Sequence, residues 1–563
     1  MFEHLLLPAP EWAEWHFGGE GGVDLGDKRR DRRAVKIAAA LAADPCASLP
    51  AAVGGDPHQA KAAYRLFSTP DLVTFQSLAC PHWQRTRRDM AELPVTLLVG
   101  DGTEVNYTHH PGTAGLGQVG DGKGRGMLLH SVLALDDRGQ VQGLAWQDLS
   151  YRPLPPPPAP RPRGQAAGAA GVAGAAGAAG KSESESRAGK GKGKGKGKGK
   201  GKGKGKGKGK GKGAPGQAGK EKKETRTQRR ARERESQVWA KAAEACGAPA
   251  PGRRYVHVCD SGADDFLFYD ACRGAGSDFL ARACQQRRAA LGHEAAAKQG
   301  LLLDLARSLP PLGGKTLELR ARKGVVKRVK RPGNRGRDKR SKVRVDVPAR
   351  RAKLLVSAAP VTVFPPWLQR GGAAGPLRLW VVRVWEVDPP PLPPGVEPVE
   401  WVLLTSVPVR DLEEAVRMAE WYSFRWLIEE YHKCLKSGCA AERRQLEHAD
   451  RLEALLGVLV VLAVRLLALK QQVLDEPDAP AAERVGELEV AVLAAHRQLD
   501  TPAEELTVYR FWREVAAMGG FLGRKGDGEP GWQTVWRGWR KLQDMVAGAR
   551  LATALGQTPA AGP

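Results

Sequence analysis

The amino-acid sequence predicts an α/β protein in which helical regions at both ends flank a core built on a β-sheet. Apolar runs at 95–100 and 255–259 are short and bounded by turn residues, which is typical of strands buried in a sheet. Residues 1–75 are alanine-rich and read as helices, and residues 532–539 repeat tryptophan at helical spacing. At 563 residues and 42% hydrophobic, the chain can bury a sizeable core.

The central region opens with three predicted strands. Apolar runs at 127–134 and 141–146 follow the strand at 95–100, and the turn Asp-Asp-Arg-Gly at 136–139 joins the last two. We therefore expect three antiparallel strands before residue 150. A second β-rich segment is expected at 310–405, which contains several further runs with strand-like composition.

An aspartate directly follows each of two predicted buried strands. Asp101 comes after the run at 95–100, and Asp260 comes after the run at 255–259. Carboxylates at this place stand at the rim of a sheet, where open sheets bind ligands. Either aspartate alone is a weak signal, because aspartate also caps turns and helices after strands.

The segment from Trp421 to Lys436 contains no glycine or proline and is predicted as a single helix. At about 100° per residue, Tyr422, Arg425, Glu429 and Lys436 fall on one narrow stripe. A solvated face with paired charges is the ordinary explanation of such a stripe. A metal held by Glu429 and phosphates held by Arg425 and Lys436 is the alternative that the two aspartates favour.

Asp101, Asp260 and Glu429 form an acidic triad without cysteine or histidine at zinc spacing. Carboxylate ligands favour hard cations such as Mg²⁺ or Mn²⁺. Two such ions, roughly 3.5–4 Å apart, can activate an attacking oxygen and stabilise the leaving oxygen of a phosphodiester.

The charge of the chain points to a polyanionic partner, most simply a nucleic acid. The net charge is +26, and without the 12 lysines of the Gly-Lys repeat at 189–213 it is still 26 − 12 = +14. The eight cysteines contain no C-x-x-C pair, which favours reduced thiols in an intracellular protein. The apolar stretch at 455–464 is too short to span a membrane and is expected to be a buried helix. We expect no membrane partner and a cytoplasmic protein.

The spacing Tyr-(2)-Arg-(3)-Glu-(6)-Lys at 422–436 resembles the signature of the bacterial cut-and-paste DDE transposases, the class that contains the tagmentation enzyme. This resemblance implies a ribonuclease-H-like catalytic core. It also implies that Asp101, Asp260 and Glu429 are catalytic metal ligands for Mg²⁺ or Mn²⁺, with two ions bound. Arg425, Lys436 and Tyr422 would then contact DNA.

The resemblance assigns further DNA contacts. Trp401 corresponds to a tryptophan that stacks on a flipped base, or is an ordinary strand tryptophan. Arg282 corresponds to a DNA-contacting arginine. Tyr107 and His109 either contact DNA or simply finish a strand. In the N-terminal region, Lys28, Arg29 and Arg30 open a basic helix that could lie on phosphates or be an exposed surface helix.

The resemblance also implies the domain organisation. We expect a helical DNA-binding domain at 1–75, the catalytic domain at 76–470 and a helical dimerisation domain at 471–563. The partners would be double-stranded DNA and a second copy of the chain in a homodimer. On the bacterial nucleoid, such an enzyme would cleave transposon ends, pass through a hairpin and transfer the strand to target DNA. A metal-dependent nuclease without strand transfer and an inactive DNA-binding inhibitor are the alternatives.

Residues 152–222 interrupt the catalytic domain with proline, alanine and glycine, followed by strict Gly-Lys alternation. Such a composition cannot form a core, so we expect disorder there. The insert is either a cationic tether that raises nonspecific DNA affinity or a repeat expansion tolerated in a surface loop. Either way, it is expected to leave the triad intact.

Overall fold

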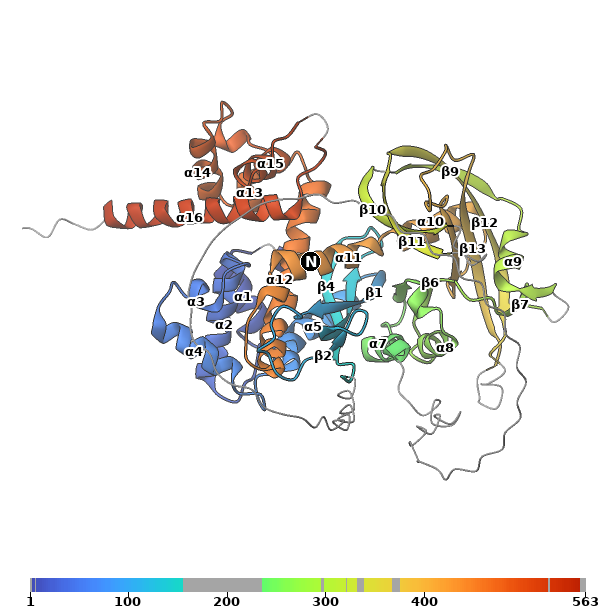
Figure 1. Cartoon of the computed structure of the whole chain (residues 1–563), viewed down its shortest axis with the longest axis horizontal. Coiled ribbons are helices and arrows are strands. Elements are labelled where there is room, and N and C mark those ends of the chain that lie inside the picture. The colour runs from blue at the N-terminus through green and yellow to red at the C-terminus, as the bar shows by residue number, and fades with distance from the viewer. Residues whose placement is uncertain are drawn as a thin grey trace, which may run out of the picture. The chain divides into compact units, whose positions relative to one another are not determined.

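The computed structural model describes residues 3–5, 7–154, 235–294, 298–319, 321–331, 339–366, 375–524 and 527–556 (Figure 1). The predicted insert at 152–222 therefore lies outside the described residues, apart from 152–154.

The N-terminal region is helical, as expected, and several of its helices start at capping side chains. Asp27, Asp56 and Thr74 each accept a hydrogen bond from a backbone N–H of the helix they precede. The helices are α1 (Ala9–Phe17), α2 (Lys28–Ala43), α3 (Leu49–Ala52), α4 (Pro57–Phe67) and α5 (Phe75–Ala91).

The predicted three-stranded unit is confirmed and belongs to a larger sheet. β1 (Val95–Asn106) pairs antiparallel with β3 (Gly124–Leu135), and β3 pairs antiparallel with β4 (Val141–Ser150). On its other edge β1 pairs in parallel with β5 (Arg254–Cys259), and β5 pairs in parallel with β6 (Asp278–Arg282). The order β4-β3-β1-β5-β6 is that of the expected ribonuclease-H-like core.

The β-rich segment continues this sheet beyond β6. β14 (Glu400–Thr405) pairs with β6, and the order runs on through β13 (Leu377–Val387) and β12 (Arg350–Val363). The strands β10 (Arg322–Arg331) and β11 (Lys339–Val347) form a second, two-stranded sheet (Figure 1). The remaining strands are β2 (Gly117–Val119), β7 (Arg288–Leu291), β8 (Gln299–Leu301) and β9 (Gly313–Leu319).

Helices connect and cover the sheet. They include α7 (Val238–Cys246), α8 (Phe266–Gly274), α9 (Leu302–Arg307), α10 (Leu412–Ser423), α11 (Trp426–Lys433) and the π-helix η5 (Cys434–Gly438). The C-terminal helices are α12 (Ala449–Asp475), α13 (Ala481–Val485), α14 (Glu487–Arg497), α15 (Val508–Met518) and α16 (Trp532–Gly556). Short 3₁₀ turns are η1 (Glu3–Leu5), η2 (Glu235–Gln237), η3 (Ser261–Ala263), η6 (Ala441–Arg443) and η7 (Ala503–Glu505).

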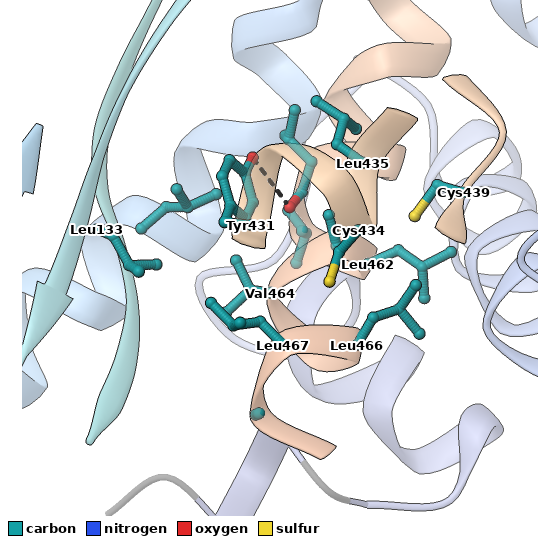
Figure 2. Close-up of a cluster of buried hydrophobic side chains, with 14 of the residues drawn as sticks. Leu133, Tyr431, Cys434, Leu435, Cys439, Leu462, Val464, Leu466 and Leu467 are labelled. Carbon is teal, nitrogen blue, oxygen red and sulfur yellow. Dashed lines mark hydrogen bonds between the residues drawn. The ribbon is translucent and has the colours of Figure 1, made fainter. Parts of the chain in front are cut away.

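The helix α12 packs against both α11 and η5. It is long and apolar enough to cross a membrane, but 94% of its most apolar stretch is buried inside the protein, as a core helix would be. Figure 2 shows Tyr431, Cys434 and Leu435 gathered with α12 side chains such as Leu462 and Leu466. The buried helix predicted at 455–464 is thereby confirmed.

Candidate active site

Asp101 and Asp260 lie on neighbouring strands at the same level of the sheet. The parallel register of β1 and β5 ends with Gly100 opposite Cys259, so the next residue on each strand is an aspartate. Neighbouring strands are about 4.8 Å apart, which brings the two residues close together. The predicted strand end before Asp101 is wrong, because antiparallel pairing with β3 carries β1 on to Asn106.

Trp239 of α7 fills the space beside both aspartates. A Cβ atom on Gly100 would come within 3.0 Å of the Trp239 ring, and a Cβ atom on Gly262 would come within 3.4 Å of it. Glycine at position 100 therefore lets the indole lie close to the backbone of β1, and the same ring is in van der Waals range of position 262. Asp260 caps its own turn by accepting a hydrogen bond from the Gly262 N–H at 2.7 Å.

The electrostatics of the pair penalise two negative charges. Burial and, after it, the negative charge of Asp260 raise the pKa of Asp101 to about 6. The Gly102 N–H and the Arg425 guanidinium act in the opposite direction, and Glu429 adds a smaller increase. A cation bound beside the two carboxylates would stabilise their charged forms and relieve this penalty.

The segment from Tyr422 to Lys436 is not the single helix that the sequence predicts. The chain turns at Phe424 and Arg425, whose N–H groups bond to carbonyls three residues earlier at 3.2 and 3.1 Å. After α11 the helix widens into η5, which carries Lys436. Tyr422 therefore belongs to α10, Glu429 to α11 and Lys436 to η5, so uniform helical spacing does not describe their directions.

Arg425 lies between two of the proposed metal ligands. Its guanidinium is 2.5 Å from the Glu429 carboxylate and 3.6 Å from the Asp101 carboxylate. Within the described ranges, no three or more His, Cys, Asp or Glu side chains are grouped so that they could hold a metal ion. The structure thus sets Asp101 beside Asp260, while Glu429, with its side chain 50% exposed, is engaged by Arg425.

Lys436 lies near the far end of β1. Its ammonium is 3.7 Å from the Glu442 carboxylate, which also accepts a hydrogen bond from the Asn106 N–H at 3.0 Å. The ring of His110 contacts the Glu442 carbonyl at 2.9 Å. Lys436 is therefore held over the same strand that carries Asp101.

Trp401, Tyr422 and Arg282 gather on one side of the site. The Trp401 and Tyr422 rings meet edge to face, with centroids 5.2 Å apart. Burial raises the pKa of Tyr422, and the guanidiniums of Arg282 and Arg425 oppose this increase. Arg282 is exposed and donates to the Glu400 carbonyl at 3.1 Å. The Trp401 ring is thus only partly buried and is supported by Tyr422.

Tyr107 and His109 differ in accessibility. Tyr107 is 1% exposed, which favours the reading that it finishes a strand. His109 is exposed in the turn after β1, so its ring is accessible to a partner.

Three family models match the chain. Residues 10–72 match a transposase DNA-binding domain, residues 229–465 match a transposase DDE domain, and residues 462–559 match a Tn5 transposase dimerisation domain. The chain belongs to the Tn5-type DDE transposases. This transposase therefore binds DNA, dimerises and depends on a divalent metal.

The DNA-binding domain of the transposase presents the basic start of α2. Lys28 and Arg29 are exposed, and Arg30 is partly exposed and donates to the Leu25 carbonyl at 2.9 Å. A hollow of about 230 Å³ beside this helix is lined by four of its cations and by residues of the neighbouring segments. Those cations are Arg29, Arg32, Arg33 and Lys36. Such a hollow suits a phosphate backbone.

In the transposase's dimerisation domain, the described tryptophans of the run at 532–539 pack against other parts of the same chain. Trp536 is 7% exposed, and the Trp539 ring lies 5.1 Å from the Trp512 ring. The side chain of Trp532 lies outside the described residues. Gly519 and Gly538 allow α15 and α16 to touch, because a Cβ on Gly538 would lie 1.6 Å from the Val515 carbonyl oxygen.

Asp264 is a structural residue of the transposase site that sequence reasoning missed. Its buried carboxylate accepts from the Tyr269 hydroxyl at 2.6 Å, from the Cys284 N–H at 2.6 Å and from the Gln285 N–H at 2.8 Å, and it pairs with Arg287 at 2.5 Å. It thereby ties the loop after Asp260 to the segment that follows β6. Its place in the run Ala-Asp-Asp gave no signal that distinguishes it from an ordinary helix cap.

Proposed function

We propose that this transposase cleaves DNA at transposon ends and transfers the freed 3′ end to target DNA. The observation that carries the proposal is the juxtaposition of Asp101 and Asp260 on neighbouring strands, with Arg425 bridging from Asp101 to Glu429. Carboxylates supply metal ligands, and the neighbouring cations supply phosphate contacts.

Asp101, Asp260 and Glu429 fit a hard divalent cation because all three donors are carboxylates. When bound, two Mg²⁺ or Mn²⁺ ions would activate the attacking oxygen and stabilise the leaving oxygen. Glu429 must leave Arg425 to join the aspartates. The freed guanidinium then becomes available to a DNA phosphate, so ligand assembly and DNA binding favour each other.

The other proposed DNA contacts surround this centre. Lys436 would exchange Glu442 for a phosphate, and Tyr422 with Arg282 would position the strand near Trp401. We further propose that a hairpin intermediate places a flipped base on the Trp401 ring. The partly buried ring supported edge-on by Tyr422 suits such stacking.

We propose a DNA-binding domain at 1–75, a catalytic domain at 76–470 and a dimerisation domain at 471–563. The matches at 10–72 and 462–559 support a DNA-binding start and a dimerising end. The enzyme would work as a homodimer on two ends, in the cytoplasm and on the bacterial nucleoid.

Single substitutions of the triad test the proposal. Asp101→Ala, Asp260→Ala and Glu429→Ala should each abolish Mg²⁺-dependent nicking of an end-containing duplex. DNA affinity should remain, because it comes mostly from Lys and Arg contacts to phosphates. Glu413→Ala is the matched control, since Glu413 is an exposed carboxylate on α10 whose partner is Arg417. Nicking at the full rate by a triad variant would remove that residue from the site.

The products of the wild-type reaction separate the alternatives. Hairpins and joined target DNA are expected for the transposase. Nicks without joined product would indicate a nuclease without strand transfer, and end binding without any nick would indicate an inhibitor. Trp401→Ala should lower hairpin formation more than first nicking, since stacking on an aromatic ring is worth about 1–3 kcal/mol per base. An equal loss of both products would remove the stacking role.

A further inference from the structure

Arg444 is a buried cation whose hydrogen-bond partners are backbone carbonyls. It is 6% exposed, and burial lowers the pKa of its guanidinium. Its Nη2 donates to the Pro45 carbonyl at 2.6 Å and to the Cys439 carbonyl at 2.8 Å, and its Nη1 donates to the Ala47 carbonyl. A buried charge is costly unless it is well hydrogen-bonded, so these three contacts determine where the side chain sits.

The three carbonyls belong to two distant parts of the chain. Pro45 and Ala47 lie between α2 and α3 in the DNA-binding domain, whereas Cys439 directly follows η5. A second link runs beside the first, because the Cys46 thiol lies 3.1 Å from the Gly438 carbonyl. The exit of η5 is therefore fastened to the loop at 45–47 from two sides.

The backbone at this exit is in an unfavourable conformation. Ala440 has a φ of 50°, in the left-handed region. This conformation costs roughly 1–2 kcal/mol for a residue with a Cβ atom. The Arg444 bond to the Cys439 carbonyl holds the peptide group that precedes Ala440. Without that bond, the turn from η5 into η6 loses a contact that keeps Ala440 in place.

Lys436 depends on the same turn. It lies within η5, and its partner Glu442 lies in η6, on the other side of Ala440. A change in the turn would alter the distance between this pair and the Asn106 N–H that anchors Glu442. A displacement of about 1 Å at a reacting group can lower a rate by roughly a hundredfold.

We propose that Arg444 is a positioning residue that couples the DNA-binding domain to the phosphate-binding Lys436. The role rests on the proposed function, in which Lys436 grips a DNA phosphate. Because the link joins the loop after α2 to η5, DNA bound on α2 and the strand held by Lys436 keep a fixed relation. Arg444 itself does not touch the reacting atoms.

Arg444→Met tests this coupling by two measurements. Hydrogen exchange of the full-length protein without DNA should quicken at residues 434–441 and at 45–48. First nicking at saturating end duplex and Mg²⁺ should slow by roughly 10- to 100-fold, while the Kd for end DNA changes less than about threefold. In this background, adding Lys436→Ala should slow nicking less than it does in the wild type, since interacting residues are not additive.

Arg465→Met is the matched control. Arg465 is also a buried arginine; it donates to the Leu7 carbonyl and its guanidinium lies over the Trp12 ring, so it links α12 to the N-terminal segment. It should lower the melting temperature but leave both exchange at 434–441 and saturated nicking close to the wild type. If Arg444→Met does not fold, Arg444→Lys carries the same test, because it keeps the charge but not the forked set of donors.

Unchanged exchange and nicking in the Arg444 variant would overturn the coupling, as would an Arg465→Met variant with the same losses. Fully additive effects of the Arg444 and Lys436 substitutions would also overturn it. If the wild-type protein does not nick end DNA, the proposed function fails, and the exchange result still decides whether Arg444 holds η5.

Discussion

Asp101→Asn should stabilise the metal-free protein at neutral pH. The perturbation removes a carboxylate that is penalised by burial and by the adjacent Asp260, which together raise the pKa of Asp101 from 3.8 to about 6. A difference of one pKa unit corresponds to about 1.4 kcal/mol, so the penalty is about 3 kcal/mol above pH 6. The Asp101 side chain is 22% exposed, so solvent screens this electrostatic penalty only moderately.

The sign of the pH dependence follows from the raised pKa. Between pH 4 and 6 the folded protein holds a proton that the unfolded chain has released, so the wild type loses stability as the pH rises through this range. The Asn variant lacks this loss. The two proteins should therefore agree near pH 3.8 and diverge by about 3 kcal/mol at pH 7.

Urea unfolding in EDTA from pH 4 to 8 measures the effect, with Glu413→Gln as the exposed control. Added Mg²⁺ should reverse the order, because an ion that binds only the folded wild type stabilises it. An Asn variant that is less stable than the wild type at pH 7 in EDTA, or a difference that does not vary with pH, would refute the reasoning.

Three further predictions concern stability. His82 is fully buried, and its Nε2 accepts from the Leu144 N–H at 3.0 Å. Because burial lowers the pKa of His82 from 6.5 to about 3, the free energy of unfolding should fall as the pH drops below 6.5. His82→Gln should flatten this fall when urea unfolding is measured at acid pH. Ala440→Gly should raise the free energy of unfolding by about 0.5–1 kcal/mol, since glycine adopts positive φ without strain; a loss of stability would contradict this. Asp264→Asn should cost about 3 kcal/mol, because it leaves Arg287, whose side chain is only 13% exposed, without its carboxylate, and a melting curve like that of the wild type would contradict it.

The sequence predicts the core strands well because their signals are local. The runs around 95–100 and 255–259 are apolar and bounded by turns, and both form strands. Their parallel pairing, which sets Asp101 beside Asp260, is a tertiary feature that no local pattern contains. The proximity of the two aspartates could be expected only from the resemblance to a family.

The helix from Tyr422 to Lys436 shows where periodicity fails. Nothing in its composition marks the turn at Phe424 or the widening at η5; the α11 helix between them packs against α12 and β1, and η5 packs against α12. The burial of Arg444 could not be predicted from the sequence either, because an arginine in a charged segment usually points to solvent. Two of its three carbonyl partners lie almost 400 residues away, at separations of 397 and 399.

The residues at either end of the low-complexity stretch meet at one side chain. Arg152, just after β4, binds both carboxylate oxygens of Glu235 at 2.6 and 2.8 Å, and binds Glu104 of β1 at 2.6 Å. Residues 152 and 235 are therefore held together by an ion pair, and lengthening the chain between them adds only a slowly growing closure entropy. Whole domains, affinity tags or fluorescent proteins inserted between residues 155 and 234 should thus leave the sheet undisturbed. The ion pair between Arg152 and Glu235 should likewise let the length of this segment vary among natural sequences.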